Sequence, residues 1–346
     1  MPKFRVIDAD GHCIERDTDL AQYAEYRGRP LRDEPGVGAM PFFPSLDGWF
    51  RVVGDALSAG DPDSWLTFLD ETGIEMTFLY PTSGLAFGLI QDREWSIALA
   101  RAYNDWLHQR YMQRSPKFKG LALVPVHDVP AAVQELRRAV TELGMPGAVL
   151  PAASGLGKGY GHPDFHPLYA EAERLDAVIT LHGAPSKGWG FDYFDKFIQT
   201  HTMEHPVSQM VQLTSMLFDG VFEYFPKLRV AYLEAGCGWV PYMMDRMDEE
   251  FERRGARWCP YLKRTPSEYL RGGNIYFSCE VEEKTLPYVV EFIGEDNLFF
   301  PSDYPHERRR EEFLDDIPHF EARTDLSDRV KEKILYHNAR RFYRLD

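Results

Sequence analysis

The chain has 346 residues, and its 44% hydrophobic and 27% charged residues are typical of a folded globular protein with a substantial core. A formal net charge of -15 argues against a nucleic-acid partner, because binding phosphates needs clustered Lys and Arg. No apolar run approaches the roughly 20 residues that cross a bilayer, and the Met1-Pro2-Lys3 start carries no signal peptide. The four cysteines are widely spaced, so neither a disulfide framework nor a zinc knuckle is indicated. We expect one domain, residues 1–346, that works in the cytoplasm without nucleic acid or a membrane.

Eight short runs rich in Val, Ile, Leu, Phe and Tyr recur along the chain, at residues 4–8, 76–81, 119–126, 146–152, 177–182, 229–234, 274–279 and 297–302. Their hydrophobicity is nearly continuous, which is typical of parallel strands buried on both faces. Helical patterns lie between most of them, at 92–114, 130–143, 164–175, 207–223, 239–253 and 283–293, and a last one covers 326–336. This alternation predicts an α/β chain folded as a (β/α)8 TIM barrel rather than an open sheet.

Residues 16–62 interrupt the alternation with a segment rich in Pro, Gly, Asp and Arg, interleaved with aromatic residues. A segment of this length inside a compact domain is usually functional, so we expect a lid or an oligomer contact. Two further segments, 155–166 and 185–206, follow the fourth and fifth strands and would overhang the same end of the barrel. Trp189, Phe191, Tyr193 and the aromatic residues of 42–50 either wall a substrate pocket or take part in ordinary packing.

Residue types that bind metals follow several of the predicted strands. Asp10 and His12 come after the first strand, His182 ends the fifth, Glu234 ends the sixth and Asp303 follows the eighth. Because the C-terminal ends of parallel barrel strands meet at one mouth, these side chains can share one cation although they lie far apart in sequence. The sequence therefore predicts a metal enzyme.

The first of these segments has two interpretations. On an extended backbone Asp8, Asp10 and His12 would share one face. An Asx turn at the strand end, with a buried Asp8 hydrogen-bonded to the backbone, explains the same residues.

Three further histidines also have open assignments. His201 and His205, just beyond His182, either complete a second metal position or lie solvated in a surface loop. His306, three residues after Asp303, orients that carboxylate, binds a substrate carboxylate or begins a helix. Cys13 and Cys237 adjoin candidate ligands, but a cysteine nucleophile needs a dedicated basic partner.

Five motifs occur along the chain in this order: Ile7-Asp8-Ala9-Asp10-Gly11-His12, Leu181-His182-Gly183, Phe225-Pro226-Lys227-Leu228 leading into Glu234-Ala235-Gly236-Cys237-Gly238-Trp239-Val240-Pro241, Ser302-Asp303-Tyr304-Pro305-His306, and Asn338-Ala339-Arg340-Arg341. Together they resemble the amidohydrolase superfamily, in the amidohydrolase-related branch typified by aminocarboxymuconate semialdehyde decarboxylase and the aromatic acid decarboxylases. The resemblance covers nearly the whole chain and implies a metal-dependent barrel. It also implies His12, His182 and Asp303 as ligands, Asp10 as a further ligand, and Glu234 as a ligand or a base.

Two positions depart from the family pattern. Asp10 stands where the family has the first histidine of an HxH motif, and Glu234 stands where many members have a histidine after the sixth strand. Some decarboxylases of this branch also use a carboxylate at the first position, whereas Glu234 puts the usual histidine acid/base role in doubt. A set of carboxylates and imidazoles suits manganese, iron or zinc. We expect one divalent ion, with a second held if His201 or His205 joins the site.

The resemblance and the candidate ligands predict a hydrolase or a non-oxidative decarboxylase acting on a small carboxylated, aromatic-derived substrate. Asp303, Glu234 and His306 are its expected catalytic residues. One alternative is a dinuclear iron or manganese oxygenase on the same scaffold, and another is a non-catalytic subunit of a larger assembly. The resemblance also suggests a homodimer or larger homo-oligomer, with 16–62 as a candidate contact.

Overall fold

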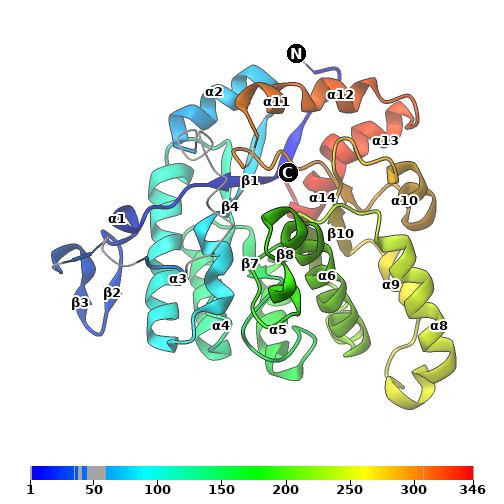
Figure 1. Cartoon of the computed structure of the whole chain (residues 1–346), viewed down its shortest axis with the longest axis horizontal. Helices are drawn as coiled ribbons and strands as arrows, with labels where there is room; N and C mark the ends of the chain where they lie inside the picture. Colours follow the sequence, from blue (N-terminus) through cyan, green and yellow to red (C-terminus); the bar gives the residue numbers. More distant parts are fainter. Residues whose placement is uncertain (1, 35, 38–40, 45–59, 307, 346) are drawn as a thin grey trace.

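Parallel strands alternate with helices along the chain in the computed structural model, which describes residues 2–34, 36–37, 41–44, 60–306 and 308–345 (Figure 1). The strands of the main sheets are β1 (Ile7–Cys13), β4 (Met76–Pro81), β5 (Phe118–Gly120), β6 (Ala122–Leu123), β7 (Gly147–Pro151), β8 (Val178–His182), β9 (Arg229–Leu233), β10 (Ile275–Ser278) and β11 (Leu298–Phe299). A separate antiparallel hairpin is formed by β2 (Glu25–Tyr26) and β3 (Arg29–Pro30). Each of the apolar runs overlaps a strand, so the α/β class expected from the sequence is confirmed.

The strands of the main sheets follow one another in space in their order along the chain. One parallel sheet has the order β1-β4-β5, and the other has the order β11-β10-β9-β8-β7-β6. Only Leu121 separates β5 from β6, and its N–H donates to Leu79 O at 3.0 Å. At the far edge, Ala9 N donates to Phe300 O at 3.1 Å and Asp303 N donates to Asp10 O at 2.8 Å. The C-terminal ends of the first and last strands therefore lie side by side.

The helices of the described residues are α1 (Asp17–Leu20), α2 (Pro62–Thr72), α3 (Arg93–Leu107), α4 (Val129–Thr141), α5 (His166–Leu175), α6 (Phe197–Phe218), α7 (Val221–Tyr224), α8 (Val240–Trp258), α9 (Pro266–Leu270), α10 (Leu286–Ile293), α11 (Arg310–Leu314), α12 (Asp316–Ala322), α13 (Asp328–Glu332) and α14 (Asn338–Tyr343). Several begin at predictable capping residues: the Asp128 carboxylate, for example, accepts from Ala131 N and starts α4. The helices of the described chain include none long and apolar enough to cross a membrane.

Helix α2, which the sequence did not predict, holds the first and last strands together. Asp61 caps its start and Gly73, at φ 75°, ends it. Its Phe68 stacks on Tyr304 with ring centroids 4.0 Å apart, and Trp65 Nε1 donates to His12 O at 2.9 Å. One helix thus fixes the backbone of a candidate ligand and packs against the loop that follows β11.

Two elements near the site, β1 and α6, have bounds that differ from those expected. Strand β1 covers residues 7–13 instead of 4–8, so Asp10 and His12 lie within the strand and not after it. Helix α6 begins at Phe197 and ends at Phe218, whereas a helix over 207–223 after a loop was expected. Pro206 normally favours a helix start, but here it lies inside the helix. Gly220, at φ 82°, separates α6 from α7.

The expected lid segment, 16–62, is described only in part. Its described portion contains α1 and the β2–β3 hairpin, and Phe42 packs against Trp95 of α3 with ring centroids 5.1 Å apart. Residues 45–59 lie outside the described residues. The lid and oligomer-contact roles stay predictions.

Candidate metal centre

Strand β1 directs Asp10 and His12 to the site and uses Asp8 elsewhere. The register between β1 and β4 shifts between Asp8 and Gly11, which breaks the even alternation of an extended strand. Asp8 accepts from Thr77 Oγ1 at 2.6 Å and from both Ser302 N and Ser302 Oγ at 2.8 Å. Burial raises the pKa of Asp8 to about 6. Asp8 is therefore a buried structural link, and its bonds from Ser302 N and, at 3.2 Å, from Asp10 N agree with the Asx-turn interpretation and not with a shared face.

Backbone carbonyls determine the tautomers of His12 and His182. His12 Nδ1 lies 2.9 Å from Pro81 O, and His182 Nδ1 lies 2.8 Å from Gly183 O. Since a carbonyl oxygen can only accept, each Nδ1 carries the hydrogen and each Nε2 has a lone pair. Neither Nε2 has a hydrogen-bond partner among the described residues. A metal-ligating imidazole has this arrangement, with its second nitrogen held by a carbonyl.

Carboxylate oxygens face these two nitrogen lone pairs. Asp10 Oδ1 lies 3.2 Å from His182 Nε2 and 3.7 Å from His12 Nε2, and Asp303 Oδ1 lies 3.3 Å from His12 Nε2. Both Asp10 oxygens are buried and accept no hydrogen bond from the described chain. A lone pair and an anionic oxygen at such distances repel each other unless a cation or a proton lies between them. These hard oxygen and nitrogen donors fit a divalent metal ion.

The acidic residues that follow β9 and β11 have left-handed backbone conformations. Glu234 has φ 58° and Asp303 has φ 54°, which costs a non-glycine residue of order 1–3 kcal/mol. Such strain persists where the surrounding structure enforces it, and it concentrates at functional sites. Glu234 N donates to Ser278 Oγ at 2.9 Å, while the Glu283 carboxylate accepts from Cys237 N at 3.1 Å and so holds the rest of this loop.

His306 belongs to the same cluster. Thr82 Oγ1 donates to Cys13 O at 2.9 Å, so it accepts from His306 Nε2 at 2.8 Å. The other ring nitrogen, Nδ1, then faces Asp303 Oδ1 at 3.1 Å and Glu234 Oε1 at 4.0 Å. The ring also stacks on His12 with centroids 3.8 Å apart. The helix-start alternative is wrong for His306, because α11 begins only at Arg310.

His201 and His205 lie on helix α6 and not on a loop. Their spacing of four residues places both rings on one face of the helix, with centroids 4.7 Å apart. His205 is buried, and its Nε2 lies 4.0 Å from Glu234 Oε2. A Cβ at position 183 would lie 2.3 Å from His205 Nδ1, so only glycine there allows this approach. The surface-loop interpretation is wrong for His205.

Potential ligand atoms converge in three overlapping groups, each with members within 4.8 Å of one another: Asp10, His12 and His182; His12, Glu234, Asp303 and His306; and His201, His205 and Glu234. The structure therefore brings together all the residues proposed from the sequence as ligands or catalytic groups.

Burial and neighbouring charges adjust the protonation of the cluster. Burial, together with nearby His306, lowers the pKa of His12 to about 4, and burial holds the pKa of His205 well below its usual range. Burial disfavours the charged form of Asp303, but the His306 and His12 side chains lower its pKa overall. Burial also opposes protonation of His182, yet the Asp10 carboxylate raises its pKa overall. Neutral His12 and ionised Asp303 are in the protonation states that ligate a cation.

Several residues that support the site could not be recognised from the sequence. Thr82 sets the tautomer of His306, Gln209 bridges two strand ends, and Glu283 lies in an acidic run that reads as a solvated surface. Among the aromatic candidates for a pocket wall, Tyr193 is 91% exposed and faces solvent. Burial raises the pKa of the Cys13 thiol well above its usual range, which disfavours a thiolate nucleophile.

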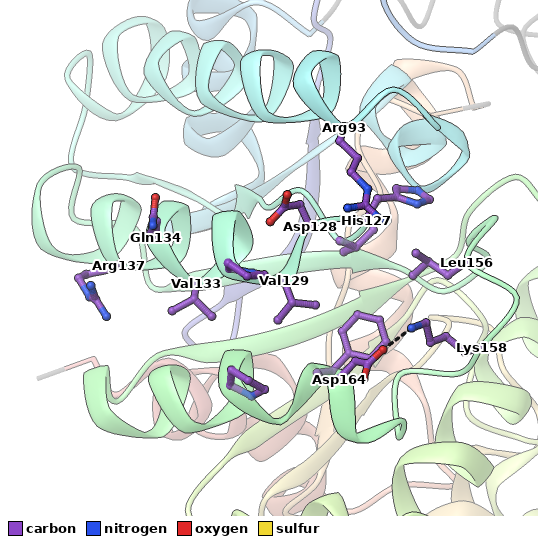
Figure 2. Close-up of a pocket in the computed structure, with 14 residues that line it drawn as sticks. Arg93, His127, Asp128, Val129, Val133, Gln134, Arg137, Leu156, Lys158 and Asp164 are labelled. Atoms are coloured by element: carbon purple, nitrogen blue, oxygen red, sulfur yellow. Dashed lines mark hydrogen bonds and ion pairs between the residues drawn. The ribbon is translucent and has the colours of Figure 1, made fainter.

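A cavity of about 440 Å³ reaches the cluster at Asp303 and is also lined by Glu280, Arg308 and His319. A second cavity, of about 770 Å³, has a separate lining that includes Arg93, His127 and Lys158 (Figure 2). Figure 2 shows Val129, Val133, Gln134 and Arg137 of α4 along its other side. No residue of the three ligand groups lines this second cavity.

Comparison with known proteins identifies the family. The amidohydrolase family model matches residues 7–345, so the chain belongs to this family. It is 28% identical over 306 residues to 2-amino-3-carboxymuconate-6-semialdehyde decarboxylase of Dictyostelium discoideum, which covers 87% of this chain and 81% of that relative. It is 29% identical over 293 residues to γ-resorcylate decarboxylase of Rhizobium radiobacter, covering 82% and 87% respectively.

A solved structure gives the same fold. Dihydroxybenzoic acid decarboxylase of Polaromonas sp. JS666, with bound manganese and the inhibitor 2-nitroresorcinol, superimposes with a TM-score of 0.79 at 22% identity, covering 99% of this chain and 97% of that one. The family model and the two sequence relatives confirm the family and enzyme class predicted from the motifs, and the structural likeness implies the TIM-barrel fold. The ligand groups of this chain fit the predicted divalent metal. These relatives support neither the oxygenase nor the non-catalytic subunit.

Proposed function

We propose that this protein is a divalent-metal-dependent, non-oxidative decarboxylase of a small aromatic carboxylate, with its site at the mouth of a closed barrel. The observation that carries the proposal is the convergence of Asp10, His12, His182 and Asp303, whose unpaired oxygen and Nε2 atoms face one another at 3.2 to 3.7 Å. We assign these four side chains as the ligands. The named activities of the relatives favour decarboxylation over hydrolysis.

A divalent ion in this site would act as a Lewis acid toward a carboxylate or phenolate oxygen of the substrate. In the reaction the bond between the ring carbon and the carboxyl carbon breaks, and the electron pair stays on the ring carbon. A proton must then take the place of carbon dioxide. We assign proton delivery to Glu234, whose side chain is 15% exposed and lies at the edge of the cluster. When the His306 ring is also protonated at Nδ1, this nitrogen, 4.0 Å from Glu234 Oε1, is placed to return a proton to Glu234.

Product analysis tests this proposal. Manganese-loaded protein is incubated with γ-resorcylate and related hydroxybenzoates, and carbon dioxide and phenolic product are measured together. In deuterium oxide the product should carry deuterium at the carbon that lost its carboxylate. Chelation or His182→Ala should abolish turnover, whereas His162→Ala, which changes a half-exposed histidine away from the cluster, should not. Product formation without carbon dioxide would replace decarboxylation by hydrolysis or hydration, and full activity after chelation would reject the metal.

A second cation position has one specific observation in its favour. The ligand atoms of His201, His205 and Glu234 lie within 4.8 Å of one another, and Glu234 also belongs to the group that contains His12 and Asp303 of the first position. This arrangement would suit the dinuclear oxygenase alternative. Metal analysis distinguishes the two functions: two equivalents of iron or manganese with oxygen-dependent turnover favour the oxygenase, and one equivalent with oxygen-independent turnover excludes it.

The remaining expectations concern the setting of the site. We propose that 16–62 covers the barrel mouth or contacts another copy of the chain, that the protein is a homodimer or larger homo-oligomer, and that it works in the cytoplasm. Light scattering measures the oligomeric state. Deleting 45–59 separates the two roles of the segment. Loss of a lid should change KM and leave the number of chains in the oligomer unchanged, whereas loss of an oligomer contact should reduce that number.

A further inference from the structure

Gln209 occupies an unusual position on helix α6. Its side chain is fully buried, and Nε2 donates to Leu181 O at 3.0 Å and to Leu233 O at 2.8 Å. These two carbonyls belong to neighbouring strands, β8 and β9. Each immediately precedes a candidate site residue, His182 or Glu234. One amide group therefore bridges the two strand ends from which the cluster is built.

The chemistry of the amide makes this bridge specific. An amide NH2 has two hydrogens, and the two carbonyl oxygens accept one each. The opposite amide orientation would set Oε1 against two carbonyl oxygens, so the donor orientation is enforced. A residue of similar size without donors would leave both buried carbonyls without these bonds, and an ionised carboxylate would repel them.

The same residue also sets the position of a third side chain. His205 precedes Gln209 by one helical turn on α6, and the absence of a Cβ at Gly183 lets its ring approach the end of β8. Anchoring Gln209 to β8 and β9 thus fixes how far α6 lies from the strand ends. The 4.0 Å approach of Glu234 Oε2 to His205 Nε2 depends on this spacing, and the 3.0 Å approach of Glu234 Oε2 to His182 Nδ1 depends on the alignment of β8 with β9.

We propose that Gln209 is a positioning residue that aligns His182, Glu234 and His205 for metal binding and proton delivery. The inference rests on the proposed function, because it assigns Gln209 a role in that same site. Loss of a contact that orients metal ligands typically reduces affinity or activity by about 10- to 100-fold. We expect an effect of this size when the two donors are removed.

The chain offers a matched control three residues further along α6. Gln212 is equally buried, and its Nε2 donates to Ala152 O at 2.7 Å while its Oε1 accepts from Tyr160 N at 2.9 Å. Its partners lie after β7, on segments that carry none of the candidate ligands. Substituting Gln212 therefore disturbs the same helix and a comparable bridge without removing a side-chain hydrogen bond to β8 or β9.

The experiment compares Gln209→Met with Gln212→Met in Mn2+ affinity, measured by electron paramagnetic resonance of free Mn2+, and in kcat and KM for γ-resorcylate. Gln209→Met should weaken Mn2+ binding or lower kcat by about 10- to 100-fold. Gln212→Met should stay within a few-fold of the wild type in both, even where the two variants lose similar thermal stability. Equal effects of the two substitutions on both quantities would overturn the proposal.

A second variant gives a readout that a purely structural role would not change. In Gln209→Glu the introduced carboxyl can donate to one carbonyl only while it is neutral, so its pKa is raised. Relative to the wild type at the same pH, activity and Mn2+ affinity should be retained at low pH and fall as the carboxyl ionises with rising pH, whereas Gln212→Glu keeps the wild-type pH profile. A wild-type profile for Gln209→Glu would also overturn the inference. Failure of the proposed function would look different, because wild-type protein would then bind Mn2+ without releasing carbon dioxide.

Discussion

Two aspartates on β1, separated by one residue, should respond in opposite ways to the same substitution. Asp8 and Asp10 are both buried. Asp8 accepts hydrogen bonds from Thr77 Oγ1, Ser302 N, Ser302 Oγ and Asp10 N. Both oxygens of Asp10 lack a hydrogen-bond donor among the described residues and face the bare Nε2 atoms of the cluster. We predict that Asp8→Asn mainly costs stability and that Asp10→Asn mainly costs metal binding.

The contacts set the size of each effect. Asn at position 8 keeps one acceptor oxygen but replaces the other with an NH2 group. In the wild type the Thr77 and Ser302 hydroxyls donate to this carboxylate, so the NH2 group would face donors and charge-assisted bonds worth about 1.5–3 kcal/mol would be disrupted. Burial raises the pKa of Asp8 to about 6, so the cost of burying its charge already offsets part of the stability that these bonds supply in the wild type. We therefore expect Asp8→Asn to lower the free energy of unfolding by about 1–3 kcal/mol at neutral pH. At position 10 the same change removes a buried charge that has no donors. The metal-free protein should therefore gain about 1–3 kcal/mol at alkaline pH, above the raised pKa of His182.

Denaturant unfolding of the metal-free proteins measures the free energy of unfolding, and titration with Mn2+ measures the metal affinity. Asp10→Asn should weaken Mn2+ binding by more than the roughly 100-fold that loss of a supporting contact can cost, and Asp8→Asn by at most about tenfold. The reasoning is refuted if both variants lose Mn2+ affinity equally. It is refuted as well if metal-free Asp10→Asn unfolds more easily than the wild type at alkaline pH.

Three further changes test other parts of the structure. Gly183→Ala places a Cβ 2.3 Å from His205 Nδ1, so it should displace that ring and lower the free energy of unfolding by about 1–3 kcal/mol. Gly155→Ala, whose Cβ meets only an ordinary 3.5 Å contact, is the control and should do neither. Denaturant unfolding measures the stability, and metal stoichiometry reports the displaced ring. Glu283→Gln should loosen the loop behind Glu234 and lower kcat more than Mn2+ affinity, with the exposed Glu291→Gln as the control. An unchanged kcat would contradict the assigned support. The Arg174 and Arg137 side chains lower the pKa of Glu171 to about 2, so this carboxylate contributes stability above its unfolded pKa of about 4.5 that is lost as pH falls toward 2. Because both arginines are more than half exposed, Glu171→Gln should lower the free energy of unfolding by only about 1 kcal/mol at neutral pH and reduce its dependence on pH in the acid range. An unchanged pH dependence in the acid range would refute the ion pairs of Glu171 as its cause.

The sequence alone was sufficient for the strands and for the identity of the main ligand candidates. Parallel strands buried on both faces need continuous apolar runs, and that need is visible locally in segments such as 177–182 and 229–234. A polar residue at the end of such a run, as at His182 and Glu234, has no role in the core and so indicates the site. The cavity reaching Asp303 and the three ligand groups agree with that prediction.

Only the tertiary structure decided how these residues are used. The register shift in β1 separates the side chains of Asp8 and Asp10, although only one residue lies between them in the sequence. Helix α6 continues through Pro206 and carries His205 to the end of β8, where Gly183 leaves room for it. Gln209 gains its role from partners 24 and 28 residues away, and Thr82 gains its role from His306, 224 residues away. Local propensity cannot report such contacts, because they form only when distant segments meet in the folded chain and satisfy one another's buried polar groups.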